Sequence, residues 1–224
     1  MKTFKQLTLE LKKMIEEGKE NTPEADILKK EIEDIKSLSE TVRNSIFLAS
    51  SRTYSETYME PLLRRKYNLT KSVDNSHDAI NQFKEHGELK SSKTLRKVYP
   101  KRKEKSLLNQ IISIQETTET NRMIPFADCK TADYLSNIQN IKRDDFEYMY
   151  YVLLFEDCAK IFFIKSEDVE KVPNWSPKHG RYDELGKSGQ FPIDKSNIQY
   201  HLNNHLIDTM TWIEITDIYI ELSK

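Results

Sequence analysis

Residues 78–93 read DAINQFKEHGELKSSK, and this stretch decides the expected fold. Asp78 is followed by a polar link and then, ten residues later, by Glu88-Leu89-Lys90. Residues two apart on a strand point to the same face, so Glu88 and Lys90 would share one face while Leu89 faces the core. The pattern predicts a hairpin-like pair, with Asp78 near the end of one strand and the two charged side chains on the inner face of the next.

Two carboxylates and a lysine in this arrangement suit metal-dependent hydrolysis of a phosphodiester. Mg²⁺ prefers oxygen ligands such as carboxylates, and a bound ion can lower the pKa of its water. A lysine beside the ion can orient or deprotonate that water and offset phosphate charge. The same spacing also arises by chance in charged proteins, so the surrounding sequence has to be read with it.

The segments on either side add acids before this stretch and basic residues after it. A helix expected over residues 54–67 carries Glu56 and Glu60, and Pro61 is expected to kink it. The stretch from 92 to 106 is the most basic of the chain and includes Lys93, Arg96, Lys97, Lys101 and Arg102. Its position just past Lys90 favours contact with phosphate groups, although charge runs are often solvated loops. Residues 107–114 are apolar enough for a short helix or strand.

Residues 146–165 change to a strand pattern. Aromatic and β-branched residues dominate 148–155 and 161–164, with a turn candidate at 156–157, which predicts an antiparallel pair extending a central sheet. Three prolines and three glycines between 173 and 192 predict a long loop. A helix is expected over 196–207, and a capping-box spacing at 211–214 opens the last helix.

The first 47 residues predict two helices. Apolar residues recur at helical spacing before Gly18, and Thr22-Pro23 supplies an N-cap and a proline at the first helical position. This pair is either a hairpin packed on the core or an arm that dimerises or embraces DNA. The expected division is therefore an N-terminal helical hairpin over 1–47 and a catalytic domain over 48–224.

Composition limits the class of protein. The net charge of −1 gives no global basic signature for nucleic-acid binding. Cys129 and Cys158 form neither a disulfide framework nor a metal-binding spacing, and no stretch approaches the roughly 18 apolar residues that span a bilayer. A cytoplasmic protein with reduced thiols and no membrane association is expected. His201 and His205 lie at i and i+4 but lack an obvious third zinc ligand, which favours a role on the helix surface or in packing.

In order and pattern, these segments resemble PD-(D/E)xK nucleases, in particular type II restriction endonucleases. The resemblance covers most of residues 50–215, with His77 where the family nominally has proline. It implies an α/β fold in which helices flank a mixed central sheet, here with an N-terminal helical extension. It also implies Mg²⁺ held by Asp78 and Glu88, Lys90 as the catalytic lysine, and an upstream helical acid, for which Glu60 is preferred over Glu56.

The resemblance implies a function as well: site-specific hydrolysis of double-stranded DNA by a homodimer. The residues expected to contact DNA are Lys93, Arg96, Lys97, Lys101 and Arg102. Two other classes stay open. One is a non-catalytic DNA-binding or assembly protein in which Glu88 and Lys90 form an ordinary charge pair. The other is a helical adaptor whose N-terminal pair binds a partner.

Overall fold

The computed structural model describes residues 1–72, 77–98, 106–178 and 188–224. The helices are α1 (Phe4–Glu16), α2 (Pro23–Leu48), the π-helix η1 (Thr53–Met59), α3 (Glu60–Tyr67), α4 (Leu107–Glu116), α5 (Ile198–Asn204) and α6 (Trp212–Leu222). Short 3-10 helices are η2 (Glu119–Arg122), η3 (Phe126–Asp128), η4 (Arg143–Asp145) and η5 (Ser166–Lys171). The strands are β1 (Ala79–Ile80), β2 (His86–Lys93), β3 (Leu95–Arg96), β4 (Tyr134–Ile141), β5 (Tyr148–Leu154), β6 (Cys158–Lys165), β7 (Gly189–Ile193) and β8 (Leu206–Thr211).

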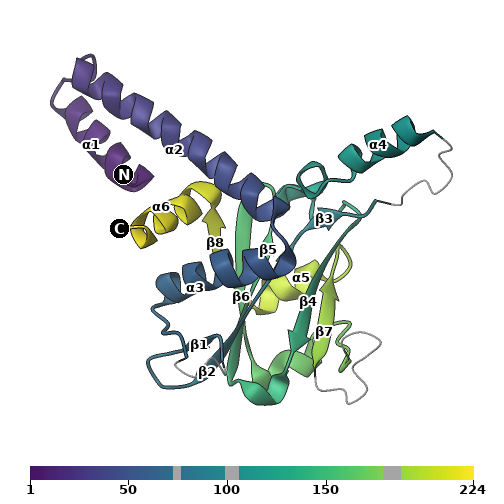
Figure 1. Cartoon of the computed structure of the whole chain (residues 1–224). Helices are drawn as coiled ribbons and strands as arrows, with labels where there is room; N and C mark the ends of the chain where they lie inside the picture. Colours follow the sequence, from purple (N-terminus) through teal and green to yellow (C-terminus); the bar gives the residue numbers. More distant parts are fainter. Residues whose placement is uncertain (73–76, 99–105, 179–187) are drawn as a thin grey trace.

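A mixed five-stranded sheet runs through the body of the molecule (Figure 1). Its order is β1-β2-β5-β6-β8, in which β2 and β5 are parallel and the other neighbours are antiparallel. This confirms the expected α/β class with a mixed sheet flanked by helices. The antiparallel β5–β6 pair is also as expected from its aromatic and β-branched residues.

A smaller antiparallel sheet, β3-β4-β7, joins the main sheet at the end of β2. The Asn137 backbone N–H donates to Ser92 Oγ at 3.0 Å, and Ser136 Oγ donates to the Lys93 carbonyl at 3.0 Å. These two bonds hold β4 against β2. The far half of β2 is therefore covered by a second strand layer instead of solvent.

Apolar side chains form a separate core on each face of the main sheet. On β5, Tyr151 and Leu153 belong to the core shared with α5 and β7, whereas Val152 and Leu154 belong to the core under α3 and α6. This alternation follows from the two-residue period of a strand. Both faces are buried, which explains why residues 148–155 read as an almost continuous apolar run.

The N-terminal helices form a projecting hairpin whose base lies in the core (Figure 1). Thr22 caps α2 with Pro23 in the first turn, as its sequence predicts, and Leu28, Ile32 and Ile35 are buried. α2 continues to Leu48, and its last turn packs under α6 beside the main sheet. Helix α6 begins with the predicted capping box at Thr211.

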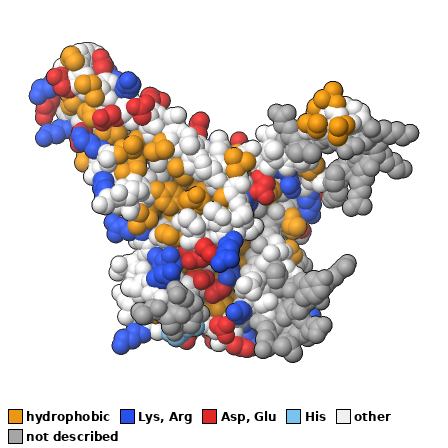
Figure 2. Space-filling view, in the orientation of Figure 1, with side chains coloured by type: hydrophobic (Ala, Val, Ile, Leu, Met, Phe, Trp, Pro, Cys, Tyr) orange, Lys and Arg blue, Asp and Glu red, His pale blue; other side chains and the backbone are white. Residues whose placement is uncertain are grey.

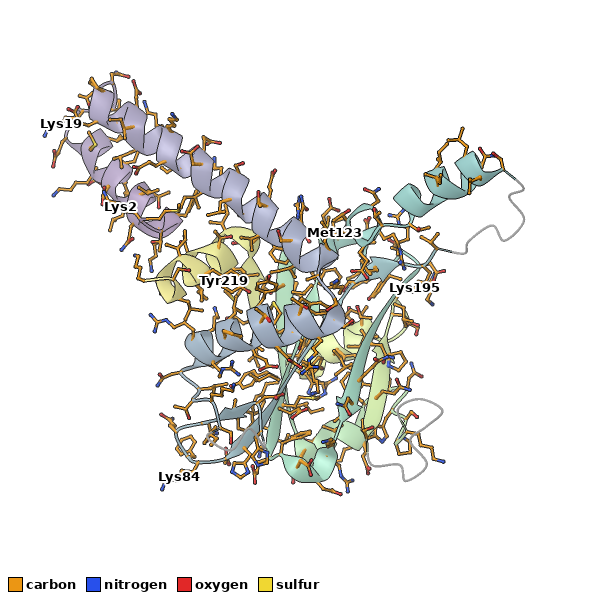
Figure 3. All side chains as sticks on the ribbon, in the orientation of Figure 1. Lys2, Lys19, Lys84, Met123, Lys195 and Tyr219 are labelled. Carbon is orange, nitrogen blue, oxygen red and sulfur yellow. The ribbon has the colours of Figure 1, made fainter. Side chains whose placement is uncertain are left out.

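Figure 3 labels Tyr219 on α6, and its hydroxyl donates to the Tyr58 carbonyl in η1 at 3.0 Å. This bond ties the last helix to the π-helix that precedes α3. The helix expected over 54–67 is thus divided. Pro61 has no N–H to continue an α-helical ladder, and the turn before it widens to a π-helix while α3 starts at residue 60.

Two expectations for the second half of the chain are corrected. The loop expected over 173–192 contains the start of β7 at residue 189, and the helix expected over 196–207 ends at residue 204. From 206 the chain forms β8, an edge strand of the main sheet, and β4 carried no prediction at all. Residues 107–114, left open between helix and strand, belong to α4.

The structure also shows the surroundings of His201 and of the two cysteines. His201 is fully buried and its Nδ1 bonds the Tyr151 hydroxyl at 2.8 Å, which confirms a packing role. Cys129 and Cys158 are free, buried thiols. Among the described residues, no helix is long and apolar enough to cross a membrane.

Candidate active site

Strand β2 presents the two charged residues of the Glu88-Leu89-Lys90 pattern on one face. Leu89 is buried on the opposite face, in the core under α3, as the strand period predicts. The Lys90 ammonium contacts Glu88 Oε1 directly, and both side chains are mostly buried. The sequence pattern therefore produces a half-buried acid–lysine pair on the inner face of β2.

Asp78 lies immediately before β1, and β1 pairs with β2 through Ala79 opposite Gly87. Asp78 Oδ2 accepts a hydrogen bond from the Leu89 backbone N–H at 2.9 Å and lies 3.9 Å from Lys90 Nζ. Asp78 thus joins the pair across a short antiparallel connection. The structure brings together the three residues expected to form the catalytic centre.

A third acid reaches this centre from the start of α3. Glu60 is mostly buried and is bonded by Arg64 Nη1 at 3.1 Å, and the same nitrogen donates to the Asp78 carbonyl at 3.0 Å. Arg64 therefore connects α3 to the strand that carries Asp78. Glu56, by contrast, has a 56% exposed side chain and pairs with the exposed Arg52. The geometry favours Glu60 as the auxiliary acid.

Burial and mutual repulsion raise the proton affinity of these acids. Desolvation, followed by the nearby Asp78 carboxylate, raises the pKa of Glu60 to about 7, against the opposing effect of Arg64. Burial also raises the pKa of Glu88, and the Asp78 charge adds to this while Lys90 opposes it. Both shifts have physical causes that a nearby cation would counteract.

These residues line one open cavity of about 790 Å³. Figure 2 shows acidic side chains gathered in the middle of this face of the molecule, with basic side chains on both sides. Besides Lys90, the lysines and arginines that line the cavity are Arg52, Arg64, Lys71 and Lys142. Such a rim suits a polyanionic ligand held over a carboxylate centre.

None of these four cations was assigned to the centre from the sequence, and Lys142 and Arg64 are the two that interact with its acids. Lys142 follows β4 and is one of the charges that lower the Glu88 pKa, although 54 residues separate the two in sequence. Arg64 stands with Arg65 and Lys66 in a basic triplet of the sequence, which by itself predicts no contact with an acid. Its spacing of four residues from Glu60 on a helix is the signal that could have identified it as a partner of that acid.

The residues expected to contact DNA differ in how exposed they are in the structure. Lys93 is only 7% exposed, and its ammonium donates to the carbonyls of Phe47 and Ala49 and contacts Glu119. The expectation that Lys93 contacts DNA does not fit this position, because the residue is used inside the fold. Arg96 is exposed on β3, and Lys97 is half-buried 3.6 Å from Asp133. Lys101 and Arg102 lie outside the described residues.

The expected Mg²⁺ site can be tested against these donors. Three carboxylates with the mutual effects described above provide the oxygen chemistry that Mg²⁺ prefers. Within the described part of the chain, however, no group of three or more His, Cys, Asp or Glu side chains is already drawn together tightly enough to hold an ion. The Lys90 ammonium contacts Glu88 through Oε1, which leaves Oε2 as the Glu88 oxygen that would face an ion. The donor set fits Mg²⁺ in chemistry but is not preassembled.

Comparison with known proteins adds no assignment. Neither the scan against models of protein families nor the search of curated proteins found a match to this chain. The site described above is therefore interpreted from its own geometry.

Proposed function

We propose that this chain is a Mg²⁺-dependent, site-specific endonuclease of the PD-(D/E)xK fold and the type II restriction class, acting on double-stranded DNA. One observation carries the proposal. Glu60 on α3, Asp78 just before β1, and Glu88 and Lys90 on β2 meet in a single open cavity rimmed by basic side chains. An incidental surface ion pair would not need an acid-crowded, half-buried setting.

Each residue has a role that its surroundings support. Asp78, Glu88 and Glu60 would hold Mg²⁺, which when bound would supply Lewis acidity and lower the pKa of water. Lys90 lies between Glu88 and Asp78 and can orient the attacking water and offset charge on the phosphate. Arg64 keeps Glu60 and the Asp78 backbone in place. Lys142 and Lys71 are positioned to attract the DNA backbone.

The proposal includes a homodimer. A two-fold symmetric protein matches a palindromic site and places one centre on each DNA strand. The projecting α1–α2 hairpin would be the arm through which the two copies pair (Figure 1).

Digestion of a DNA of known sequence tests the proposal directly. Purified protein with Mg²⁺ should cut at a defined sequence, and end mapping should give the same offset on both strands. EDTA should abolish cutting. Intact DNA at every Mg²⁺ concentration, with the protein folded, would refute the endonuclease proposal.

A helical adaptor is the second candidate, although the observation that favours it lies on α4 and not on the N-terminal helix pair expected from the sequence. Helix α4 has four exposed large apolar side chains, Leu107, Leu108, Ile111 and Ile112. Exposed apolar patches often mark sites of protein contact. Under this alternative, purified protein would neither cut nor bind DNA, and Glu88→Gln would leave its activity as an adaptor intact.

A further inference from the structure

A second cavity of about 440 Å³ adjoins the carboxylate cavity. Both linings include Arg52, Ser55, Lys90 and Asn140, so the two cavities form one groove. Among the described residues, Glu119 is the one acid in the lining of the added part, and it contacts Lys93; most of the other polar side chains there are neutral. On β4 these are Asn137, Gln139 and Asn140. A nucleic-acid strand leaving Lys90 in this direction would pass over three amide groups.

A β-bulge brings two of these amides to the surface. The two-residue period places Asn137 and Gln139 on the same face of β4. The pairing of β4 with β7 then shifts register between Ile138 and Ile141, and Asn140 has a φ of +57°. Bulges often re-aim a side chain beside an active site, and asparagine tolerates this left-handed conformation. Gln139 and Asn140 are consequently both exposed at adjacent positions.

A chain of hydrogen bonds fixes this part of β4 relative to the catalytic strand. The Asn137 N–H is bonded to Ser92 Oγ, and Asn137 Nδ2 donates to Gln190 Oε1 at 3.1 Å. Gln190 Nε2 in turn donates to the Lys178 carbonyl at 3.2 Å. Gln139 therefore lies only two residues from Asn137, whose backbone is bonded to Ser92 on β2. The Gln139 and Asn140 side chains themselves form no hydrogen bond to the residues that the structure describes.

We propose that Gln139 and Asn140 read adenine beside the cleaved bond, an inference that rests on the proposed DNA substrate. A side-chain amide presents a donor and an acceptor side by side. Adenine shows the complementary pair, N7 and the N6 amino group, in the major groove. Guanine shows two acceptors there and pairs with arginine or lysine instead. The hydrogen bond from the Asn137 N–H anchors the backbone beside the bulge to β2, the strand that carries Lys90.

The experiment uses a randomised DNA pool with the full-length protein. Wild type, Gln139→Ala, Gln139→Glu and Asn140→Gly are compared for the sequences they cut with Mg²⁺ and the sequences they retain on binding with EDTA. Glycine at 140 keeps the positive φ accessible. Gln199→Ala is the matched control, because Gln199 is an exposed amide on α5 that belongs to neither described lining.

The expected result is an adenine requirement close to the cut in wild type that Gln139→Ala or Asn140→Gly relaxes by about 10-fold to 100-fold. Gln139→Glu should shift the preference toward cytosine, whose N4 amino group donates to a carboxylate. Gln199→Ala should behave as wild type. Unchanged base preference in all three groove variants would overturn the inference while leaving the nuclease proposal standing.

The measurement of DNA binding with EDTA separates this inference from the nuclease proposal. If wild type binds DNA without cutting it, and the groove variants lose an adenine preference, the nuclease proposal fails and base reading stands. If wild type neither cuts nor binds the pool, both fail.

Discussion

At the residue scale, Gly87 decides how closely β2 approaches β5. A Cβ at this position would lie 2.4 Å from the ring of Tyr148, which is buried and has little room to move. We expect Gly87→Ala to lower the free energy of unfolding by about 1–3 kcal/mol, measured by urea denaturation. Because Glu88 is the next residue, DNA cutting should fall as well.

A double variant supplies the control. Tyr148→Leu removes the ring atoms that the new methyl group would meet, so Gly87→Ala should cost less in that background than in wild type. Equal costs in the two backgrounds would contradict the steric explanation.

Burial of His201 predicts a pH dependence of stability. Desolvation lowers its pKa to about 3, from 6.5 in an unfolded chain. The unfolded state therefore binds the extra proton below pH 6.5, so stability is present above that pH and lost as pH falls toward 3. The slope from this residue approaches about 1.4 kcal/mol per pH unit. In His201→Gln, unfolding measured from pH 7 to 4 should show a shallower slope; an unchanged slope would contradict this account.

The spacing of Asp78, Glu88 and Lys90 in the sequence was sufficient to predict that they lie close together, because a short hairpin and a two-residue strand period are local properties. The choice between Glu60 and Glu56 was not local. It depends on where Pro61 interrupts the helix and on Arg64, whose side chain reaches the Asp78 carbonyl only in the folded chain. Lys142 is likewise far from Glu88 in sequence, and it lies beside the centre only because β4, which ends at residue 141, runs toward it.

At the element scale, Lys93 joins three parts of the fold. Its ammonium bonds the last carbonyls of α2 and contacts Glu119 in η2. We expect Lys93→Met to lower the free energy of unfolding by about 3 kcal/mol, because two backbone carbonyls lose a charged donor. The salt dependence of DNA binding should stay unchanged.

Arg96 gives the matching surface variant. Arg96→Ala should leave stability within about 0.5 kcal/mol. It should also reduce the slope of log affinity against log salt concentration by about 1, as expected for one phosphate contact. The reverse pattern, in which Lys93→Met changes the slope and Arg96→Ala does not, would restore Lys93 as a DNA contact.

The elements that sequence reasoning found and missed differ in composition. β5 and β6 are central and carry continuous apolar residues, so their pattern is strong. β7 contains Pro192, which is compatible with its edge position, and β8 reads LIDTMT at the edge of the main sheet. Edge strands bury fewer side chains, and their sequences consequently resemble loops.

At the scale of the whole molecule, we expect that residues 48–224 do not fold without the helical hairpin. Ile46 and Phe47 are buried in the core under α6, and Lys93 depends on carbonyls at the end of α2. Deletion of residues 1–47 should abolish the cooperative thermal transition, followed by circular dichroism. A fragment 48–224 that unfolds cooperatively near the wild-type temperature would support a separate N-terminal domain.

The most direct test of the central claim compares two glutamates of the same cavity. DNA cutting with Mg²⁺ is measured for wild type, Glu88→Gln and Glu56→Gln, after thermal unfolding shows that all three are folded. Loss of a group that acts on the reacting centre should slow Glu88→Gln by at least about 100-fold, while exposed Glu56→Gln cuts at close to the wild-type rate. Cutting by Glu88→Gln at the wild-type rate would contradict the assignment of this cavity as the catalytic centre.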